Sequence, residues 1–276
     1  MEVQFSFGLI SDVQYCDGDA WRERYFRESP AKLREAVEAF NGRDLAFVLH
    51  LGDVIDKWDA SFGGILPVFA EINAPLYHIP GNHDFEAVKR YSEEEVFKLM
   101  NIPNPGYRSF SLGKWRFILL NGTEISTFSL NPTNRVHGEK LLQLLEKAKL
   151  LQAKPWNAGI GVEQFIWLQK EIEAAAHRNE TVIIGCHYPI YPANDHNLWN
   201  DSEILSLISQ YSHVKLWLNG RQHSGNYGIY HHVHCLTMVG MVEKHETAYA
   251  IAHVYDSRIE IEGFGREEEI RILGFK

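Results

Sequence analysis

The sequence predicts an α/β fold in which two mixed β-sheets pack face to face and helices flank them. Its 276 residues are 45% hydrophobic and 23% charged, a globular composition with enough chain for a large core. Over most of the chain, short apolar runs alternate with segments of helical periodicity, which indicates right-handed crossovers between mostly parallel strands. The C-terminal stretch lacks room for helices and predicts antiparallel strands. Two sheets flanked by helices accommodate both parts.

The individual strands are predicted from short apolar, β-branched runs. In the alternating part of the chain they cover residues 3–11, 45–51, 76–79, 115–120, 181–186 and 214–218. Antiparallel strands are expected in 228–243, 247–256 and 258–265. Helical patterns run near 20–41, 61–73, 92–100, 138–152, 162–177 and 201–212. The helix near 92 begins with a capping box, because Ser92 is followed three residues later by Glu95.

The chain is expected to form a single domain over residues 1–276, because no linker, repeat or low-complexity tract divides it. One segment differs in character: residues 122–160 form a long polar loop followed by a helix. Such a loop–helix insertion is either a functional lid or a plain surface insertion.

Charge and cysteine content exclude several classes of protein. The formal net charge of −9 argues against a nucleic-acid-binding protein, which would present a basic face. The N-terminus lacks a signal-peptide pattern, and no apolar run approaches the roughly 18 residues of a membrane span. The cysteines Cys16, Cys186 and Cys235 are sparse, which predicts a reduced, cytoplasmic setting. No nucleic-acid or membrane partner is expected, and the oligomeric state stays open.

Side chains with oxygen or nitrogen donors follow five of the predicted strands, at the point where each strand ends. They are Asp12 and Gln14, then Asp53, then Asn82, His83 and Asp84, then His187, and finally Arg221 and His223. The carboxyl ends of the strands in an open α/β sheet share one edge, and ligands bind there. These residues are therefore expected to converge.

The types of these residues favour metal-assisted phosphate chemistry. Carboxylates, an amide and imidazoles without thiolate form a ligand set for a divalent cation such as Mn²⁺, Fe or Zn²⁺. A carboxylate such as Asp53 can bridge two cations, and two cations clamp a phosphoryl group. His83 is too close in sequence to Asn82 to ligate beside it, so a general acid is its expected role, with Asp84 orienting the imidazole. A small phosphate-containing substrate is the expected partner.

Taken in order, the motifs DVQ, GDVID, GNHD, CHYP and GRQH resemble those of the calcineurin-like metallophosphoesterases. The resemblance covers nearly the whole chain, and it implies a two-sheet sandwich with outer helices and a site for two metals. Gln14 stands where most of that superfamily has histidine, which is similar to the manganese-dependent ADP-ribose/CDP-alcohol diphosphatases. Residues 22–40, 197–208 and 240–266 are similar to the same group. The resemblance implies a hydrolase of the diphosphate linkage in ADP-ribose or CDP-alcohol compounds.

The resemblance also implies roles for single residues. Asp12, Gln14, Asp53 and His223 would hold the first metal, and Asp53, Asn82 and His187 would hold the second. His83 would be the catalytic histidine. Mn²⁺ is the ion that the resemblance implies, with metal-activated water as the attacking group.

Arg221 departs from the family pattern Gly-His-x-His, whose first histidine ligates the second metal. Arginine stays protonated and cannot ligate. Either the second metal binds weakly, held by the other ligands and water, or the guanidinium replaces part of its role by gripping a phosphate bidentately. The cost of placing a desolvated arginine against a cation favours the first alternative.

Tyr188 and Trp199 are candidate substrate contacts, because they lie in loops near the expected site and an aromatic ring can stack a nucleobase. Core packing is the alternative for each ring. Two competing functions stay open for the whole chain. One is a phosphodiesterase or phosphomonoesterase on the same fold. The other is a non-catalytic binding protein with a degraded metal site, for which Arg221 is the support.

Overall fold

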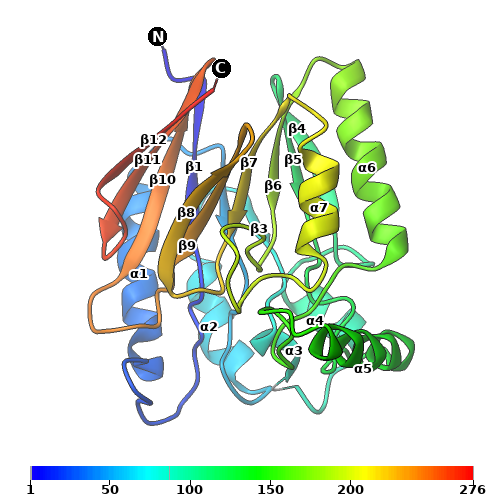
Figure 1. Ribbon diagram of the computed structural model, residues 1–276. Coiled ribbons are helices and arrows are strands. Elements are labelled where there is room, and N and C mark those ends of the chain that lie inside the picture. The colour runs from blue at the N-terminus through cyan, green and yellow to red at the C-terminus, as the bar shows by residue number, and fades with distance from the viewer. Residues whose placement is uncertain (1, 87, 276) are drawn as a thin grey trace.

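A computed structural model describes residues 2–86 and 88–275 and contains two six-stranded sheets with helices outside them (Figure 1). The first sheet is formed by β1 (Phe5–Ile10), β2 (Phe47–His50), β3 (Leu76–His78), β10 (Ala248–Val254), β11 (Arg258–Gly265) and β12 (Ile270–Gly274), in the spatial order β12-β11-β10-β1-β2-β3. The second is formed by β4 (Arg108–Leu112), β5 (Trp115–Leu119), β6 (Thr181–Gly185), β7 (Val214–Asn219), β8 (Ser224–Tyr230) and β9 (Val233–Val239), in the order β4-β5-β6-β7-β9-β8.

Parallel pairs lie at the heart of each sheet. β1, β2 and β3 run parallel in the first, and β5, β6, β7 and β9 run parallel in the second. Antiparallel strands complete both sheets, with β10, β11 and β12 on one and β4 and β8 on the other. The predicted fold class, two mixed sheets with flanking helices, is confirmed. The carboxyl ends of β1, β2 and β3 share one edge, and those of β6 and β7 share another.

The two sheets pack against each other through alternating side chains, because every second residue of a strand points to the same face. Phe7 stacks on Phe47 with ring centroids 4.8 Å apart, and Phe117 from the other sheet meets both rings edge-on. Burying each ring stabilises the fold by roughly 1.5–3 kcal/mol. This packing fixes the strand ends of the first sheet relative to the strand ends of the second.

Helices cover the outer faces of the sheets. The structure describes α1 (Ser29–Asn41), α2 (Ser61–Phe69), α3 (His83–Glu86), α4 (Glu93–Leu99), α5 (Pro132–Lys147), α6 (Val162–His177) and α7 (Asp201–Ile208), with a 3₁₀ turn at Phe26–Glu28. α1 and α2 pack on the first sheet, and α6 and α7 pack on the second (Figure 1). The capping box predicted from Ser92 and Glu95 is confirmed at the start of α4. Within the described residues, no helix has the length and apolarity of a membrane span.

Several predicted boundaries were wrong. The helix expected over 20–41 begins at Ser29, where a proline fits the first turn because the N–H it lacks has no helical partner there. α5 begins inside the expected polar loop, because the Asn131 side chain caps two amides of its first turn. The strand expected over 228–243 is the end of β8 and all of β9, separated by a turn at His231 with φ +55. The sequence patterns do not predict the edge strands β4 and β12.

Candidate metal centre

The loops after β1, β2 and β6 bring three ligand-type side chains to one point. One ligand atom each of Asp12, Asp53 and His187 lies within 4.8 Å of the others, and all three residues are fully buried. His223, from the loop after β7, joins them with its Nε2 atom 3.3 Å from Asp12 Oδ1. Polar residues at the ends of strands from both sheets therefore meet in one cluster.

His187 is held so that one ring nitrogen faces the cluster. Its Nδ1 atom lies 2.8 Å from the carbonyl oxygen of Leu51, which can only accept, so Nδ1–H donates to it. Nε2 lies 3.3 Å from Asp53 Oδ2. Partners of this kind set the tautomer of a metal-ligating histidine and leave the other nitrogen for the metal.

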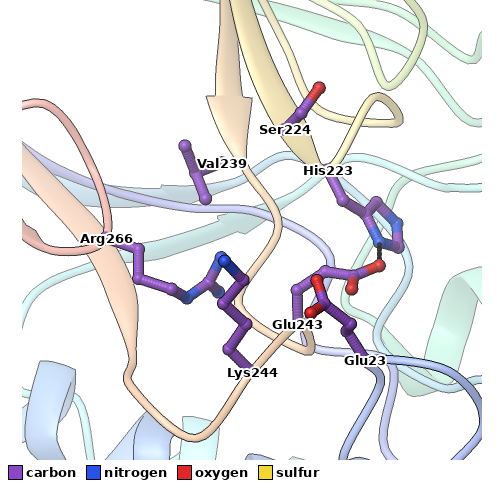
Figure 2. Close-up of a pocket in the computed structure, with 7 residues that line it drawn as sticks. All are labelled: Glu23, His223, Ser224, Val239, Glu243, Lys244 and Arg266. Atoms are coloured by element: carbon purple, nitrogen blue, oxygen red, sulfur yellow. Dashed lines mark hydrogen bonds and ion pairs between the residues drawn. The ribbon is translucent and has the colours of Figure 1, made fainter.

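His223 is held in the same way by a carboxylate. Its Nδ1 atom donates to Glu243 Oε1 at 2.8 Å (Figure 2). This leaves Nε2 directed toward Asp12. A pocket of about 610 Å³ opens beside the His223–Glu243 pair. Sequence analysis missed Glu243, because a single carboxylate at the end of a strand-rich stretch carries no distinguishing pattern. Its position in the similar stretch 240–266 was the one signal that pointed to it.

Two amide side chains come from the loops after β1 and β3. Gln14 Nε2 lies 2.9 Å from Asp53 Oδ2 and 3.1 Å from His223 Nε2. The two ends of an amide have the same shape, so a half-turn about the last bond would present Oε1 at the same position. Asn82 donates from Nδ2 to Glu86 Oε1 at 3.3 Å, and its Oδ1 atom forms no hydrogen bond with the described part of the chain.

The orphaned polar atoms of the cluster fit a cation. Within the described residues, the buried atoms without a hydrogen-bond partner include Asp12 Oδ1, Gln14 Oε1, Asn82 Oδ1 and His187 Nε2. A buried polar group without a partner is costly, so such atoms indicate a ligand. The donor set is oxygen and imidazole nitrogen without sulfur, which suits Mn²⁺, Fe or Zn²⁺.

Strained backbone and glycines allow these loops to approach closely. Asp12, Gln14 and Asp53 all have positive φ, at 51°, 45° and 61°. Such conformations are costly for residues other than glycine and cluster at functional sites. Gly52 has φ +102, and a Cβ atom there would lie 2.6 Å from His187 Nδ1. A Cβ atom on Gly81 would collide with Asp53.

Opposite charges stabilise each other inside the cluster. Burial raises the pKa of Asp12, but the positive charge of His223 outweighs it and brings the pKa to about 2. Burial acts against ionised Asp53 as well, yet His187 and His83 hold the pKa of this carboxyl well below its usual range. Burial lowers the pKa of His187, and Asp53 raises it to about 9. Both carboxylates are therefore ionised and able to bind a cation.

Asp84 supports the Asp53 loop and does not orient His83. Its carboxylate accepts from four backbone amides, those of Val54 and Ile55 on Oδ1 and those of Asp53 and Gly81 on Oδ2. The expectation that Asp84 orients the imidazole is therefore wrong, because this carboxylate is turned toward the backbone.

His83 faces a pocket at the edge of the cluster. Its side chain is 18% exposed, and Nδ1 lies 3.7 Å from Asp56 Oδ1. The backbone amide of His83 donates to Asp53 Oδ1 at 2.9 Å, so the main chain at His83 is tied to the cluster. The pocket has a volume of about 240 Å³, and its lining includes Trp21 and Arg24. His83 is thus open to a small molecule while the ligand-type residues behind it are buried.

Arg221 lies against the cluster and is 7% exposed. Its backbone amide donates to Asp12 Oδ2 at 3.1 Å, and its Nη2 atom donates to the carbonyl of Trp156 at 3.2 Å. Its Nε atom has no partner among the described residues. The positive charge of Arg221 is one of the influences that lower the pKa of Asp53. Through Trp156, the 122–160 segment therefore reaches the edge of the site.

The two aromatic residues expected to contact a substrate are buried instead. Tyr188 has no exposed surface, donates from its hydroxyl to the Trp156 carbonyl, and lies under the Arg221 guanidinium, 5.6 Å from the ring centroid. Trp199 is 2% exposed and packs with Leu142 and Ala153 of the 122–160 segment. Both expectations are wrong, because this segment covers the two rings.

The sequence model of the family described as Calcineurin-like phosphoesterase matches residues 5–225. A manganese-dependent ADP-ribose/CDP-alcohol diphosphatase from Arabidopsis thaliana is 30% identical, over 95% of this chain and 94% of that protein. The Homo sapiens protein of the same name is 27% identical, over 100% of this chain and 94% of that protein.

Among solved structures, a dimetal phosphatase from Danio rerio has a TM-score of 0.88 at 24% identity and covers 100% of both chains. A purple acid phosphatase from yellow lupin seeds has a TM-score of 0.65 at 11% identity, with 98% of this chain and 53% of that chain covered. Both share the fold described above. Because the family match spans the strands and loops that build the buried ligand cluster, the chain belongs to the calcineurin-like phosphoesterase family and is a metallophosphoesterase.

Proposed function

We propose that this metallophosphoesterase uses Mn²⁺ to hydrolyse the diphosphate linkage of a nucleoside diphosphate-linked small molecule of the ADP-ribose or CDP-alcohol type. The observation that carries the proposal is the set of buried ligand-type atoms on Asp12, Gln14, Asn82 and His187 that form no hydrogen bond within the described residues. The full-length similarity to relatives named for this activity and for manganese supports the choice of substrate class and ion.

The ligands divide between two positions. Asp12, Gln14, Asp53 and His223 would hold the first metal, and Asp53, Asn82 and His187 would hold the second. A cation bound there neutralises charge on the phosphoryl oxygens and makes water a stronger nucleophile near neutral pH. The chain itself keeps both carboxylates ionised and directs one nitrogen of each imidazole inward.

His83 is the proposed general acid for the leaving phosphate. Water adds to one phosphorus, the bridging P–O bond breaks, and a proton from His83 passes to the departing oxygen. The ring borders an open pocket, and its Nδ1 atom lies 3.7 Å from the carboxylate of Asp56, whose negative charge favours a proton on the imidazole.

Arg221 is the proposed phosphate-binding residue. One edge of its guanidinium is tied to the Trp156 carbonyl, while Nε is left without a partner among the described residues. A free guanidinium donor beside the cluster can bind a phosphoryl oxygen. Since its positive charge also opposes a cation nearby, we propose that the second metal binds more weakly than the first.

A substrate panel tests the proposal. With Mn²⁺, ADP-ribose should yield AMP and ribose phosphate, and CDP-choline should yield CMP and phosphocholine. Turnover of cyclic AMP or p-nitrophenyl phosphate with ADP-ribose left intact would make the chain a phosphodiesterase or phosphomonoesterase. His83→Ala should lose activity on the true substrate. Absence of turnover on all four compounds would favour the non-catalytic binding protein.

We also propose a reducing, cytoplasmic setting. Cys16, Cys186 and Cys235 are all unbridged and buried. Burial raises the pKa of Cys186 to about 12, so this thiol stays protonated and unreactive. Fractionation of cells that express the native chain would check this location.

A further inference from the structure

Lys32 places a buried positive charge behind the metal centre. The residue lies on α1 and is 4% exposed. Its ammonium lies within hydrogen-bonding distance of four consecutive backbone carbonyls, and its three N–H groups are shared among them: Met241 at 3.1 Å, Val242 at 3.1 Å, Glu243 at 3.3 Å, and Lys244. No carboxylate forms an ion pair with Lys32 in the part of the chain that the structure describes. A buried lysine is normally paired with a carboxylate, so this arrangement is unusual.

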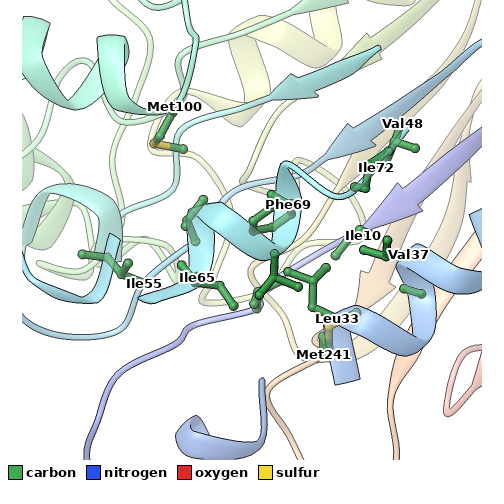
Figure 3. Close-up of a cluster of buried hydrophobic side chains, with 14 of the residues drawn as sticks. Ile10, Leu33, Val37, Val48, Ile55, Ile65, Phe69, Ile72, Met100 and Met241 are labelled. Atoms are coloured by element: carbon green, nitrogen blue, oxygen red, sulfur yellow. The ribbon is translucent and has the colours of Figure 1, made fainter. Parts of the chain in front are cut away.

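The carbonyls of the 241–244 loop, which lies between β9 and β10, point at the ammonium. Four carbonyl dipoles that point at one place repel one another unless a cation lies there, as in the carbonyl rings that bind potassium ions. Burial and the charge of Arg266 lower the pKa of Lys32 to about 8, which leaves it charged at neutral pH. Met241 lies among the apolar residues of α1 and α2 beside Leu33, so the loop is anchored on this side as well (Figure 3).

The same loop is bonded to two of the proposed ligands of the first metal. The Val242 amide donates to the carbonyl of Asp12 at 3.0 Å, and the neighbouring Gly240 amide donates to the carbonyl of His223 at 3.0 Å. The Glu243 side chain accepts from His223 Nδ1, as Figure 2 shows. Movement of the loop would therefore release the imidazole of His223 from its partner.

We infer that Lys32 is a positioning residue of the metal centre: it holds the 241–244 loop so that Glu243 keeps His223 directed toward Asp12. The inference rests on the proposed function, because it assigns a consequence for metal binding. Lys32 itself contacts none of the proposed ligand atoms. Its influence passes through backbone carbonyls, and then through one hydrogen bond, to the imidazole.

Binding of Mn²⁺ to the intact protein, followed by the EPR signal of the free ion, tests the inference. Lys32→Met keeps the apolar stem but removes the charge, and it should weaken binding about tenfold, at the lower end of the range for residues that orient metal ligands. Lys32→Arg keeps a charged donor and should bind within about threefold of the wild type. The control is Glu180→Gln, which weakens a buried ion pair to Arg116 at the amino end of β6, away from the site. It should bind Mn²⁺ normally.

Chemical rescue separates positioning from general destabilisation. Lys32→Ala leaves a space among the carbonyls, so methylammonium should restore much of its Mn²⁺ affinity. Tetramethylammonium, at equal concentration, has no N–H to donate and should not. Folded Lys32→Met and Lys32→Ala variants with wild-type Mn²⁺ affinity would overturn the inference, as would equal rescue by both salts.

Failure of the proposed function would be recognised separately. A wild-type protein that binds no Mn²⁺ would overturn the proposed function. The positioning role would then be decided by ¹⁵N NMR of the metal-free chain. The His223 ring should show a protonated Nδ1 in the wild type, and this signature should be lost or averaged in Lys32→Met. An unchanged tautomer would overturn the positioning role.

Discussion

Asp84→Asn tests how the Asp53 loop is held. The Asp84 carboxylate accepts four backbone amides, Val54 and Ile55 on one oxygen and Asp53 and Gly81 on the other. Asparagine keeps the shape but replaces one oxygen with an NH₂ group, so two buried amides would face a donor. Each unsatisfied amide costs about 1–3 kcal/mol, so Asp84→Asn should lower the free energy of unfolding by about 2–6 kcal/mol. Domains are typically stable by only about 5–15 kcal/mol.

The charge of Asp84 decides the conditions of this measurement. Burial and the charge of Asp53 raise the pKa of Asp84 to about 7, while hydrogen bonds from Gly81 and Ile55 oppose the rise. Above that pH the carboxylate is ionised and only accepts, so unfolding should be measured near pH 8.5. Urea titration followed by the fluorescence of the 7 tryptophans yields the change in free energy, provided that the slope m is unchanged.

The control for this measurement is Asp59→Asn. Asp59 accepts a hydrogen bond from one exposed backbone amide, that of Lys89 at 3.0 Å. Asp59→Asn should therefore lower the free energy of unfolding by less than about 1 kcal/mol. An equally small loss for Asp84→Asn would refute the reasoning. It would show that Asp84 is protonated in the folded chain and that the four amides do not depend on an ionised acceptor.

Three further perturbations follow from the site and the core. Arg221→His should raise the affinity for a second Mn²⁺ about tenfold or more, because imidazole can ligate and guanidinium cannot. At a low free Mn²⁺ concentration, the number of bound ions per chain should rise from about one toward two. An unchanged number would contradict the assignment. Glu243→Gln should weaken Mn²⁺ binding about 10–100-fold in calorimetry, because the carboxylate orients His223, whereas wild-type affinity would show that this hydrogen bond is dispensable. Stability should fall as the pH drops below about 6.5, because burial lowers the pKa of His78 to about 3 and the unfolded chain therefore takes up the proton first. The contribution of His78 to the free energy of unfolding is fully present above the pKa that this side chain has in the unfolded chain. At pH 5 the loss of this contribution should reach about 2 kcal/mol. His78→Gln should flatten this dependence in urea titrations, and a slope equal to that of the wild type would disprove the role of His78.

Periodicity along the chain was sufficient to predict most of the strands and the strand ends where the ligand-type residues lie. Asp12 and Asp53 follow neighbouring parallel strands of the first sheet, whose carboxyl ends share one edge, whereas His187 follows a strand of the second sheet and meets them because the two sheets pack together. The boundaries were less predictable, since a side-chain cap such as that of Asn131 starts a helix within a segment whose composition is typical of a loop.

The direction of individual side chains within the loops was not predictable. His83 and Asp84 are neighbours, yet one borders an open pocket and the other is buried against four amides. Tyr188 and Trp199 lie in loops near the site, where exposure would suit substrate binding, but the 122–160 segment covers both. Adjacent residues in a loop have no common periodicity that would reveal which one faces the site.

By itself, the sequence determined the class of fold, the family and the set of residue types that meet at the strand ends, because alternation and strand order are local or topological properties. Only the tertiary structure decided which polar atom bonds to which. Lys32 and the carbonyls of residues 241–244 are about two hundred positions apart, and Glu243 reaches His223 across a turn and two strands. Such pairs form through the packing of distant segments, and the energy of a buried polar atom depends on the partner that this packing supplies.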